Sequence, residues 1–100
     1  MNLVPSRSSG KLTSSQVLLQ QKGFVSNLLI RTDGSNAATI TFYDGLNDRG
    51  RIICDVAVAG ASLFGGMGWE HPLICENGLY VGVSGTGASC YVYYQDPNVI

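Results

Sequence analysis

The most reactive side chains in this chain are its one histidine, His71, and its cysteines, Cys54, Cys75 and Cys90. Nucleophilic catalysis by a Cys/His pair would require a cysteine, the histidine and an orienting carboxylate to meet in the fold. His71 directly precedes Pro72, and none of the cysteines lies in a recognised local nucleophile signature. Because a lone histidine is far more often structural than catalytic, we expect no catalytic residues and no enzymatic activity. A Cys/His enzyme is the lowest-ranked alternative.

The cysteines do not form a metal-ligand pattern either. They are an odd set of three, without metal-ligand spacing, and each lies in an apolar, strand-like context. We interpret them as small hydrophobic core residues of a protein kept in a reducing compartment. One disulfide plus a free thiol is the weaker alternative.

Oxygen ligands for calcium could come from Asp44, Asn47 and Asp48, which lie in a polar connection next to Gly45. Calcium takes about 6–8 oxygens from a defined loop, and three candidates without a known spacing are a weak signal. The glycine-rich run 78–87 lacks the strand-to-helix context of a phosphate-binding loop. We therefore predict no metal site and no cofactor.

The composition points to a surface that other protein covers. The chain has 100 residues, enough for one domain, and only 13% of them are charged, against the usual quarter or so. Few charges together with 13 glycines and five tyrosines are typical of a protein whose exterior is partly an interface. The alternative is a neutral β surface rich in Ser and Thr.

The charge pattern excludes some partners. The formal net charge is −1 and the six basic residues are scattered, so the chain lacks the basic patch that a nucleic-acid-binding protein needs. No apolar segment approaches the roughly 20 residues that span a bilayer, and the first residues do not have the pattern of a signal peptide. We expect neither nucleic acid nor membrane as a partner.

Short alternating segments closed by turn residues predict an all-β protein. The expected strands are 16–20, 24–31, 38–43, 51–59, 69–75, 79–84 and 88–95, with an Asp33-Gly34 turn between the second and third. Pro72 confines its strand to a sheet edge or a bulge, because proline cannot donate to the ladder. These about seven strands predict a single-domain antiparallel β-sandwich over residues 14–100. The expected core faces are Phe24, Leu28 and Ile30; Ala38, Ile40 and Phe42; Ile52, Cys54, Val56 and Val58; and Ala88, Cys90, Val92 and Tyr94.

The first 13 residues resemble an extended N-terminal arm. They are rich in Ser, contain Pro5 and Gly10, and show no sustained period. Such an arm is either disordered or ordered only against a neighbouring subunit, and both alternatives stay open. Leu3, Val4 and Leu12 would dock it.

Other apolar residues are expected at a contact surface of the domain. The segment 60–68 has no clear period, so it either folds over an end of the sandwich or packs against a partner. Two tyrosines project from the outward face of the last strand, where a ring can be buried while its hydroxyl stays hydrated. The candidate contact residues are Leu3, Val4, Leu12, Leu63, Phe64, Met67, Trp69, Tyr91 and Tyr93.

Several runs resemble a family of small structural proteins of tailed-bacteriophage virions. The runs are Thr-Ile-Thr-Phe-Tyr-Asp-Gly at 39–45, Gly-Arg-Ile-Ile at 50–53, and Asn-Gly-Leu-Tyr-Val-Gly-Val-Ser-Gly-Thr-Gly-Ala-Ser-Cys-Tyr-Val-Tyr-Tyr at 77–94. The resemblance covers roughly residues 23–94, and the segment 61–71 has no counterpart in it. It implies a compact β-sandwich, jelly-roll-like, that decorates or cements a capsid or belongs to a tail or fibre, commonly as a trimer.

We therefore expect a capsid decoration or cement protein that self-associates, with a homotrimer favoured. Its partners would be the major capsid protein or other virion proteins, and it would act in the virion after synthesis and assembly in the host cytoplasm. The alternative is a tail or fibre module that binds a host receptor or glycan, with Trp69 and the tyrosines stacking on sugar rings.

Overall fold

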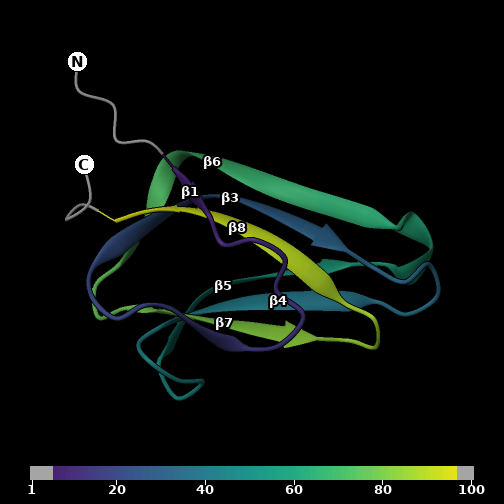
Figure 1. Ribbon diagram of the computed structural model, residues 1–100, viewed down its shortest axis with the longest axis horizontal. Coiled ribbons are helices and arrows are strands. Elements are labelled where there is room, and N and C mark those ends of the chain that lie inside the picture. Colours follow the sequence, from purple (N-terminus) through teal and green to yellow (C-terminus); the bar gives the residue numbers. More distant parts are fainter. Residues whose placement is uncertain (1–5, 97–100) are drawn as a thin grey trace.

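The computed structural model describes residues 6–96, and these form a sandwich of two four-stranded antiparallel sheets (Figure 1). Sheet A has the order β1-β8-β3-β6 and sheet B the order β2-β7-β4-β5. The strands are β1 (Arg7–Ser8), β2 (Gln16–Leu19), β3 (Gly23–Arg31), β4 (Ala38–Asp44), β5 (Arg51–Val58), β6 (Phe64–Cys75), β7 (Leu79–Ser84) and β8 (Ser89–Gln95). The predicted all-β sandwich is confirmed, with eight strands in the described residues.

The strand order is that of a jelly roll. Hydrogen bonds pair β1 with β8, β2 with β7, β3 with β6 and β4 with β5, as in one long hairpin folded over on itself. Successive pairs alternate between the two sheets, and the β3/β8 and β4/β7 ladders complete each sheet. This topology wraps the chain twice around one core.

The core lies between the sheets and follows the predicted alternation over most strands. Ala38, Ile40 and Phe42 of β4 are at most 1% exposed, and β8 contributes Cys90 and Val92, which are fully buried. Leu28 and Ile30 of β3 are paired with Val92 and Cys90 within sheet A and are buried on the same side of it. The buried hydrophobic residues are Leu12, Leu19, Val25, Leu28, Ile30, Ala38, Ile40, Phe42, Val58, Cys75, Leu79, Val81, Ala88, Cys90 and Val92.

The core face predicted for the start of β3 is wrong by one residue. Phe24 was expected inside, but Val25 is fully buried and Phe24 is only half-buried. The register with β8 shifts between Val25 and Asn27, so Ser26 is an extra residue in the strand. A bulge of this kind reverses the alternation on one side of it. The Ser26 hydroxyl donates to the Tyr93 carbonyl at 3.0 Å.

The core face predicted for the start of β5 is also wrong, because of a second bulge. Ile52 was expected in the core but is 56% exposed, and Ile53 packs against the core in its place. The register with β4 moves from Cys54 to Ile52 over one step of the partner strand, which leaves Ile53 as the extra residue. Strand periodicity alone cannot locate such an insertion.

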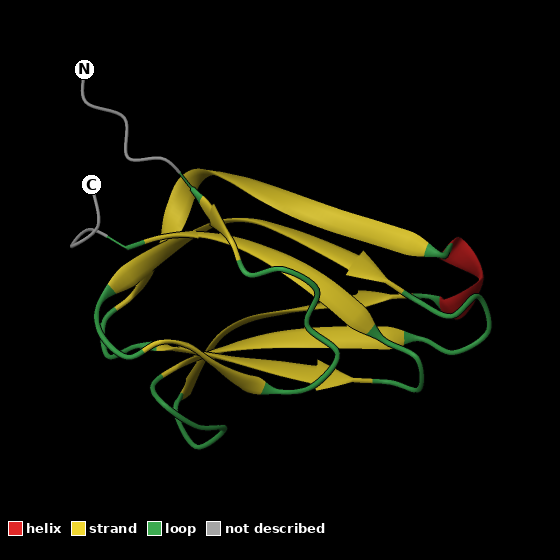
Figure 2. Ribbon diagram, viewed as in Figure 1, coloured by secondary structure: helices red, strands yellow, loops and turns green. Residues whose placement is uncertain are grey.

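The segment 60–68 is more regular than its sequence indicated. Gly60–Ser62 form a 3₁₀ turn at one end of the sandwich (Figure 2), and β6 already begins at Phe64. This strand is at the edge of sheet A. Its pairing with β3 is irregular, because Gly68 pairs with Asn27 and the next paired residue, Leu73, pairs with Val25. Pro72 lies within that irregularity, so the predicted edge and bulge are both confirmed.

Residues 6–13 lie against β8 of their own domain. β1 pairs with the end of β8, and Leu12 and Cys90 exchange two backbone hydrogen bonds of 2.8 and 3.0 Å. Leu12 is 4% exposed, so it belongs to the core. This part of the expected arm therefore forms an edge of sheet A, whereas residues 1–5 are outside the described residues. No helix in residues 6–96 is long and apolar enough to cross a membrane.

Candidate functional site

The outer face of sheet A carries a group of aromatic and aliphatic side chains. Tyr91, Leu29 and Gly66 are paired in one row across β8, β3 and β6, on the opposite side from the buried Ile30. Residues paired in register share a face of the sheet, so the rows identify the outward side chains. We call this surface the aromatic face, and it comprises Phe24, Leu29, Phe64, Ile74, Tyr91 and Tyr93.

The aromatic face is accessible and has few charges. Phe64 is 65% exposed and Ile74 is 47% exposed, while the other members are half-buried. Among the residues paired in register across β8, β3 and β6, Arg31 is the one charged residue. Aromatic groups with charges only near the margin are what the buried centre of a protein interface contains. The aromatic face therefore has the composition of a contact surface.

Five of the predicted contact residues lie on this face or at its β6 edge. Phe64, Tyr91 and Tyr93 are members of the aromatic face. Leu63, 57% exposed, immediately precedes β6 in the chain. Met67 pairs with the buried Leu28 and so points to the inner side, but it remains 46% exposed because β6 is an edge strand.

The structure does not place the other predicted contact residues on this face. Leu12 is in the core of its own domain. Trp69 is partly buried against the core, with its ring 6.1 Å from that of Phe42 at an interplanar angle of 58°. Leu3 and Val4 are outside the described residues.

Phe24, Leu29 and Ile74 belong to the aromatic face but were not among the predicted contact residues. Leu29 could have been found, because it alternates with the core residues Leu28 and Ile30. Phe24 is outside only because of the bulge at Ser26. The orientation of Ile74 depends on the register after the β6 irregularity, which the sequence does not reveal.

A hollow of about 160 Å³ lies on the outer face of sheet B. Tyr43 of β4 and Tyr80 of β7 are cross-strand partners, with ring centroids 5.9 Å apart and an interplanar angle of 58°. The Tyr43 ring lies close to Gly82, where a Cβ would be 3.2 Å from Cε2 of that ring. The lining residues are Ser15, Thr41, Tyr43, Asp48, Tyr80, Gly82, Val83 and Ser84.

The thiols are poorly suited to nucleophilic chemistry. Cys75 and Cys90 are fully buried, and desolvation raises the pKa of Cys75 to about 12, with a smaller contribution from the charge of Asp44, and that of Cys90 to about 11. Desolvation likewise raises the pKa of the half-buried Cys54. The nucleophile is the thiolate, which these shifts disfavour. The interpretation of the cysteines as core residues is confirmed for Cys75 and Cys90, and all three are free thiols.

The candidate calcium ligands do not converge. The Asp44 carboxylate accepts from the Asn77 amide at 2.8 Å and lies 3.7 Å from Arg51, and the Asn47 side chain accepts from the Arg49 amide at 2.9 Å. Asp48 instead lines the hollow on sheet B. Within residues 6–96, no group of three or more His, Cys, Asp or Glu side chains could hold a metal ion.

Comparison of this chain with protein-family models, with curated protein sequences and with solved structures finds no match.

Proposed function

We propose that this protein is a structural component of a bacteriophage virion, a decoration or cement protein that self-associates and stabilises the shell through non-covalent contacts. The observation that carries the proposal is the aromatic face of sheet A, with its exposed edge strand β6. The sequence resemblance supplies the virion context, and the face supplies a means of attachment.

Contact through this face would be stabilised mainly by the hydrophobic effect. Burial of apolar surface contributes about 25 cal/mol per Å², and a standard interface buries about 800 Å² on each partner. Aromatic side chains are the most frequent strong contributors to such interfaces. Phe64, at 65% exposure, has the most surface to gain, and Gly66 and Gly68 keep the adjoining part of β6 low enough for close approach.

The neighbouring copies in this proposal are further molecules of the same chain, with the major capsid protein or another virion protein beneath them. The homotrimer comes from the resemblance. The jelly-roll sandwich is compatible with it, because one outer face can contact a neighbour while the other stays free.

The test is protein composition and add-back with purified phage particles. We expect the protein in mass spectra of purified virions, and we expect it to bind again to shells from which it has been stripped. Phe64→Ser should weaken rebinding at least about tenfold, since the buried phenyl ring would be lost. The fold should tolerate this change at a mostly exposed position.

The control is Ala57→Ser, which introduces the same serine at an exposed, outward position on β5, the edge strand of sheet B. It should rebind like the unmodified protein. Absence of the protein from purified virions, or equal rebinding by Phe64→Ser and the unmodified protein, would contradict the proposal.

The alternative of a glycan-binding tail or fibre module was expected to use Trp69. Its ring packs against Phe42 of the opposite sheet, so it is committed to the fold. On the aromatic face the exposed ring is that of Phe64, and Tyr91 and Tyr93 are half-buried. The contact function is therefore better supported for sheet A.

A further inference from the structure

The hollow on sheet B has a chemistry that contact between proteins does not explain. Its lining combines the two phenol groups of Tyr43 and Tyr80 with the hydroxyls of Thr41, Ser84 and Ser15. The Ser15 hydroxyl accepts from the Val83 amide at 2.9 Å, which holds the segment before β2 against β7. The hollow thus presents aromatic surface and several hydroxyl groups in one place.

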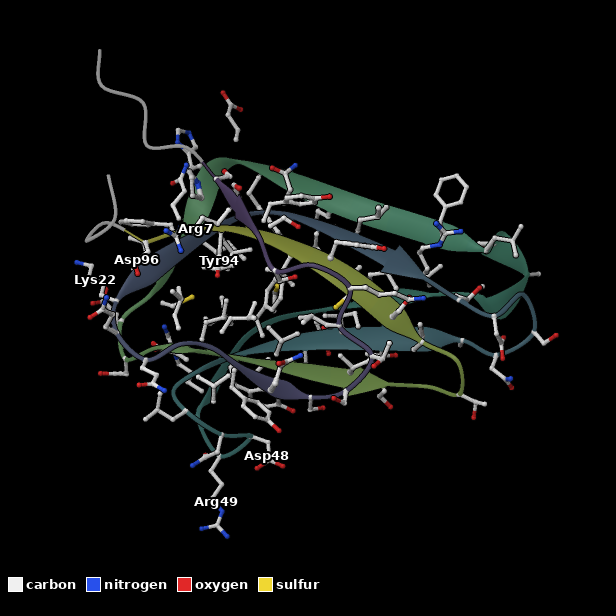
Figure 3. The ribbon with its side chains drawn as sticks, viewed as in Figure 1. Arg7, Lys22, Asp48, Arg49, Tyr94 and Asp96 are labelled. Atoms are coloured by element: carbon white, nitrogen blue, oxygen red, sulfur yellow. The ribbon has the colours of Figure 1, made fainter. Side chains whose placement is uncertain are left out.

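Asp48 supplies the one charge in this lining. It is held on a short turn in which the Arg49 amide donates to the Asn47 side chain at 2.9 Å and the Gly50 amide donates to the Asn47 carbonyl at 3.3 Å. Figure 3 shows Asp48 on the loop below sheet B, with Arg49 pointing away from the sheets. Among the described residues the Asp48 carboxylate has no ion pair, so it is free to accept hydrogen bonds from a ligand.

The charge and the lining select the class of ligand. A carboxylate without a basic neighbour in the lining disfavours phosphate and other anions. A metal ion would require more oxygen ligands than one carboxylate offers. Neutral sugars fit, because their hydroxyls exchange hydrogen bonds with carboxylate and hydroxyl groups while their C–H faces pack on aromatic rings.

The size of the hollow limits the ligand to about one ring. Its volume of about 160 Å³ is well below the roughly 300–1,000 Å³ of pockets for drug-sized ligands. A Cβ at Gly82 would lie 3.2 Å from Cε2 of Tyr43, so any side chain at this position would displace the Tyr43 ring that lines the hollow. No positive φ is required at Gly82, so backbone conformation does not account for it.

We propose that the hollow is a binding site for a single neutral sugar ring, such as a terminal residue of a surface glycan. The ring packs against Tyr43 and Tyr80, and its hydroxyls donate to Asp48 and exchange hydrogen bonds with Thr41 and Ser84. The site is on the opposite sheet from the aromatic face, so it can operate whether or not the proposed virion function is correct.

The experiment is amide chemical-shift mapping of isotopically labelled full-length protein. Glucose, galactose, mannose, N-acetylglucosamine and rhamnose are titrated separately at millimolar concentrations. We expect at least one of them to shift amides of residues 41–43, 48 and 80–84, with a Kd on the order of 1 mM, as is reasonable for a small ligand in an open site.

Gly82→Val is the main variant, because its side chain would displace the Tyr43 ring and occupy part of the hollow. A β-branched residue is compatible with a strand, so the fold should be retained. Binding should be lost, and the remaining spectrum should report an intact fold. Asp48→Asn, on an exposed turn, should weaken binding at least about tenfold through loss of a charged acceptor. Tyr91→Leu, a tyrosine change on sheet A, is the matched control and should bind like the unmodified protein.

Three outcomes would overturn the inference. They are no shift with any of the five sugars, sugar binding that Gly82→Val leaves intact, and tighter binding of tetramethylammonium than of every sugar. The last outcome would make the tyrosine pair a cation site instead.

Discussion

The two outer faces of this sandwich differ although they are built on the same topology. β3 and β4 are each flanked on both sides in their sheets, and their inward residues share one core. Outward, β3 presents Phe24 and Leu29 together with the polar Asn27 and Arg31, whereas β4 presents Thr39, Thr41 and Tyr43. Both sheets contribute to one core, so packing of the core does not require the two outward faces to differ.

The outward residues of β3 and those of β4 are both compatible with a β-strand. Threonine, tyrosine, phenylalanine and leucine all form strands readily enough, so local propensity does not require an apolar face on sheet A. Leaving that face in water forgoes the free energy of burying it. The middle strand β4 of sheet B presents hydroxyl groups instead, and an exposed aliphatic residue, Ile52, lies at the β5 edge. In the proposed function, sheet A would contact protein and sheet B would remain hydrated around its hollow.

The largest effect that we expect is from a change in the core between the two sheets, which should lower the stability of the whole domain. Phe42 is 1% exposed and contacts Trp69 across the sandwich, so Phe42→Ala should lower the free energy of unfolding by about 3–5 kcal/mol. Phe42→Leu retains most of the volume and should cost about 1 kcal/mol. Urea denaturation measures both. Equal losses of unfolding free energy in the two variants would show that the buried volume at this position does not determine the stability.

Alkaline pH should destabilise the domain through the two buried thiols, both of which are on sheet A. Cys75 and Cys90 of sheet A have pKa values raised above the ordinary 9.0, to about 12 and about 11. Their neutral form favours folding fully below the unfolded pKa, and this stability is lost as the pH rises from 9 toward the folded pKa values. Each thiol should contribute a loss of about 1.4 kcal/mol per pH unit in that range.

The measurement is urea denaturation between about pH 8 and about pH 10, with Cys90→Ala as the comparison variant, which should show a shallower decline. Alkylation of the folded protein with iodoacetamide at pH 8 should modify Cys54 first, because this thiol of sheet B is only partly buried. Faster alkylation of Cys75 or Cys90 than of Cys54 would contradict their burial in the core.

The smallest expected effect is at the edge of the aromatic face. Leu63 has φ 63° and ψ −45°, a conformation that strains any residue with a Cβ. Leu63→Gly should relieve this strain and stabilise the domain by about 1 kcal/mol after the added flexibility of the unfolded chain, or about 4–8 °C in Tm. Leu63→Ala keeps the strain and should not stabilise. A lower Tm for the glycine variant than for the alanine variant would show that the side chain itself holds this edge.

Much of the fold was predictable because strands with one buried face leave a simple alternating pattern. The pattern located β4, β7 and β8 closely and gave the correct core residues for β4 and β8. It failed at the bulges around Ser26 and Ile53, where one added residue reverses the faces and leaves no mark on periodicity. It also missed the first half of β6, whose glycines have no alternation to detect.

The surfaces were less predictable than the core. The low charge predicted a contact surface, but its members come from three strands that only the register brings together. Leu12 was expected on the N-terminal arm and Trp69 at the contact surface of the domain, yet both pack inward. The hollow on sheet B could not be predicted, since it depends on the pairing of Tyr43 with Tyr80 and on the glycine beside them.

One pair of variants tests the difference between the faces most directly. Leu29→Glu and Thr39→Glu each place a carboxylate at a half-buried, outward position on a middle strand, the first on sheet A and the second on sheet B. Sedimentation equilibrium gives the native mass. We predict a multiple of the 10.6 kDa chain mass for the unmodified protein and for Thr39→Glu, and dissociation at least about tenfold easier for Leu29→Glu. A monomeric unmodified protein, or equal masses for both variants, would contradict the account.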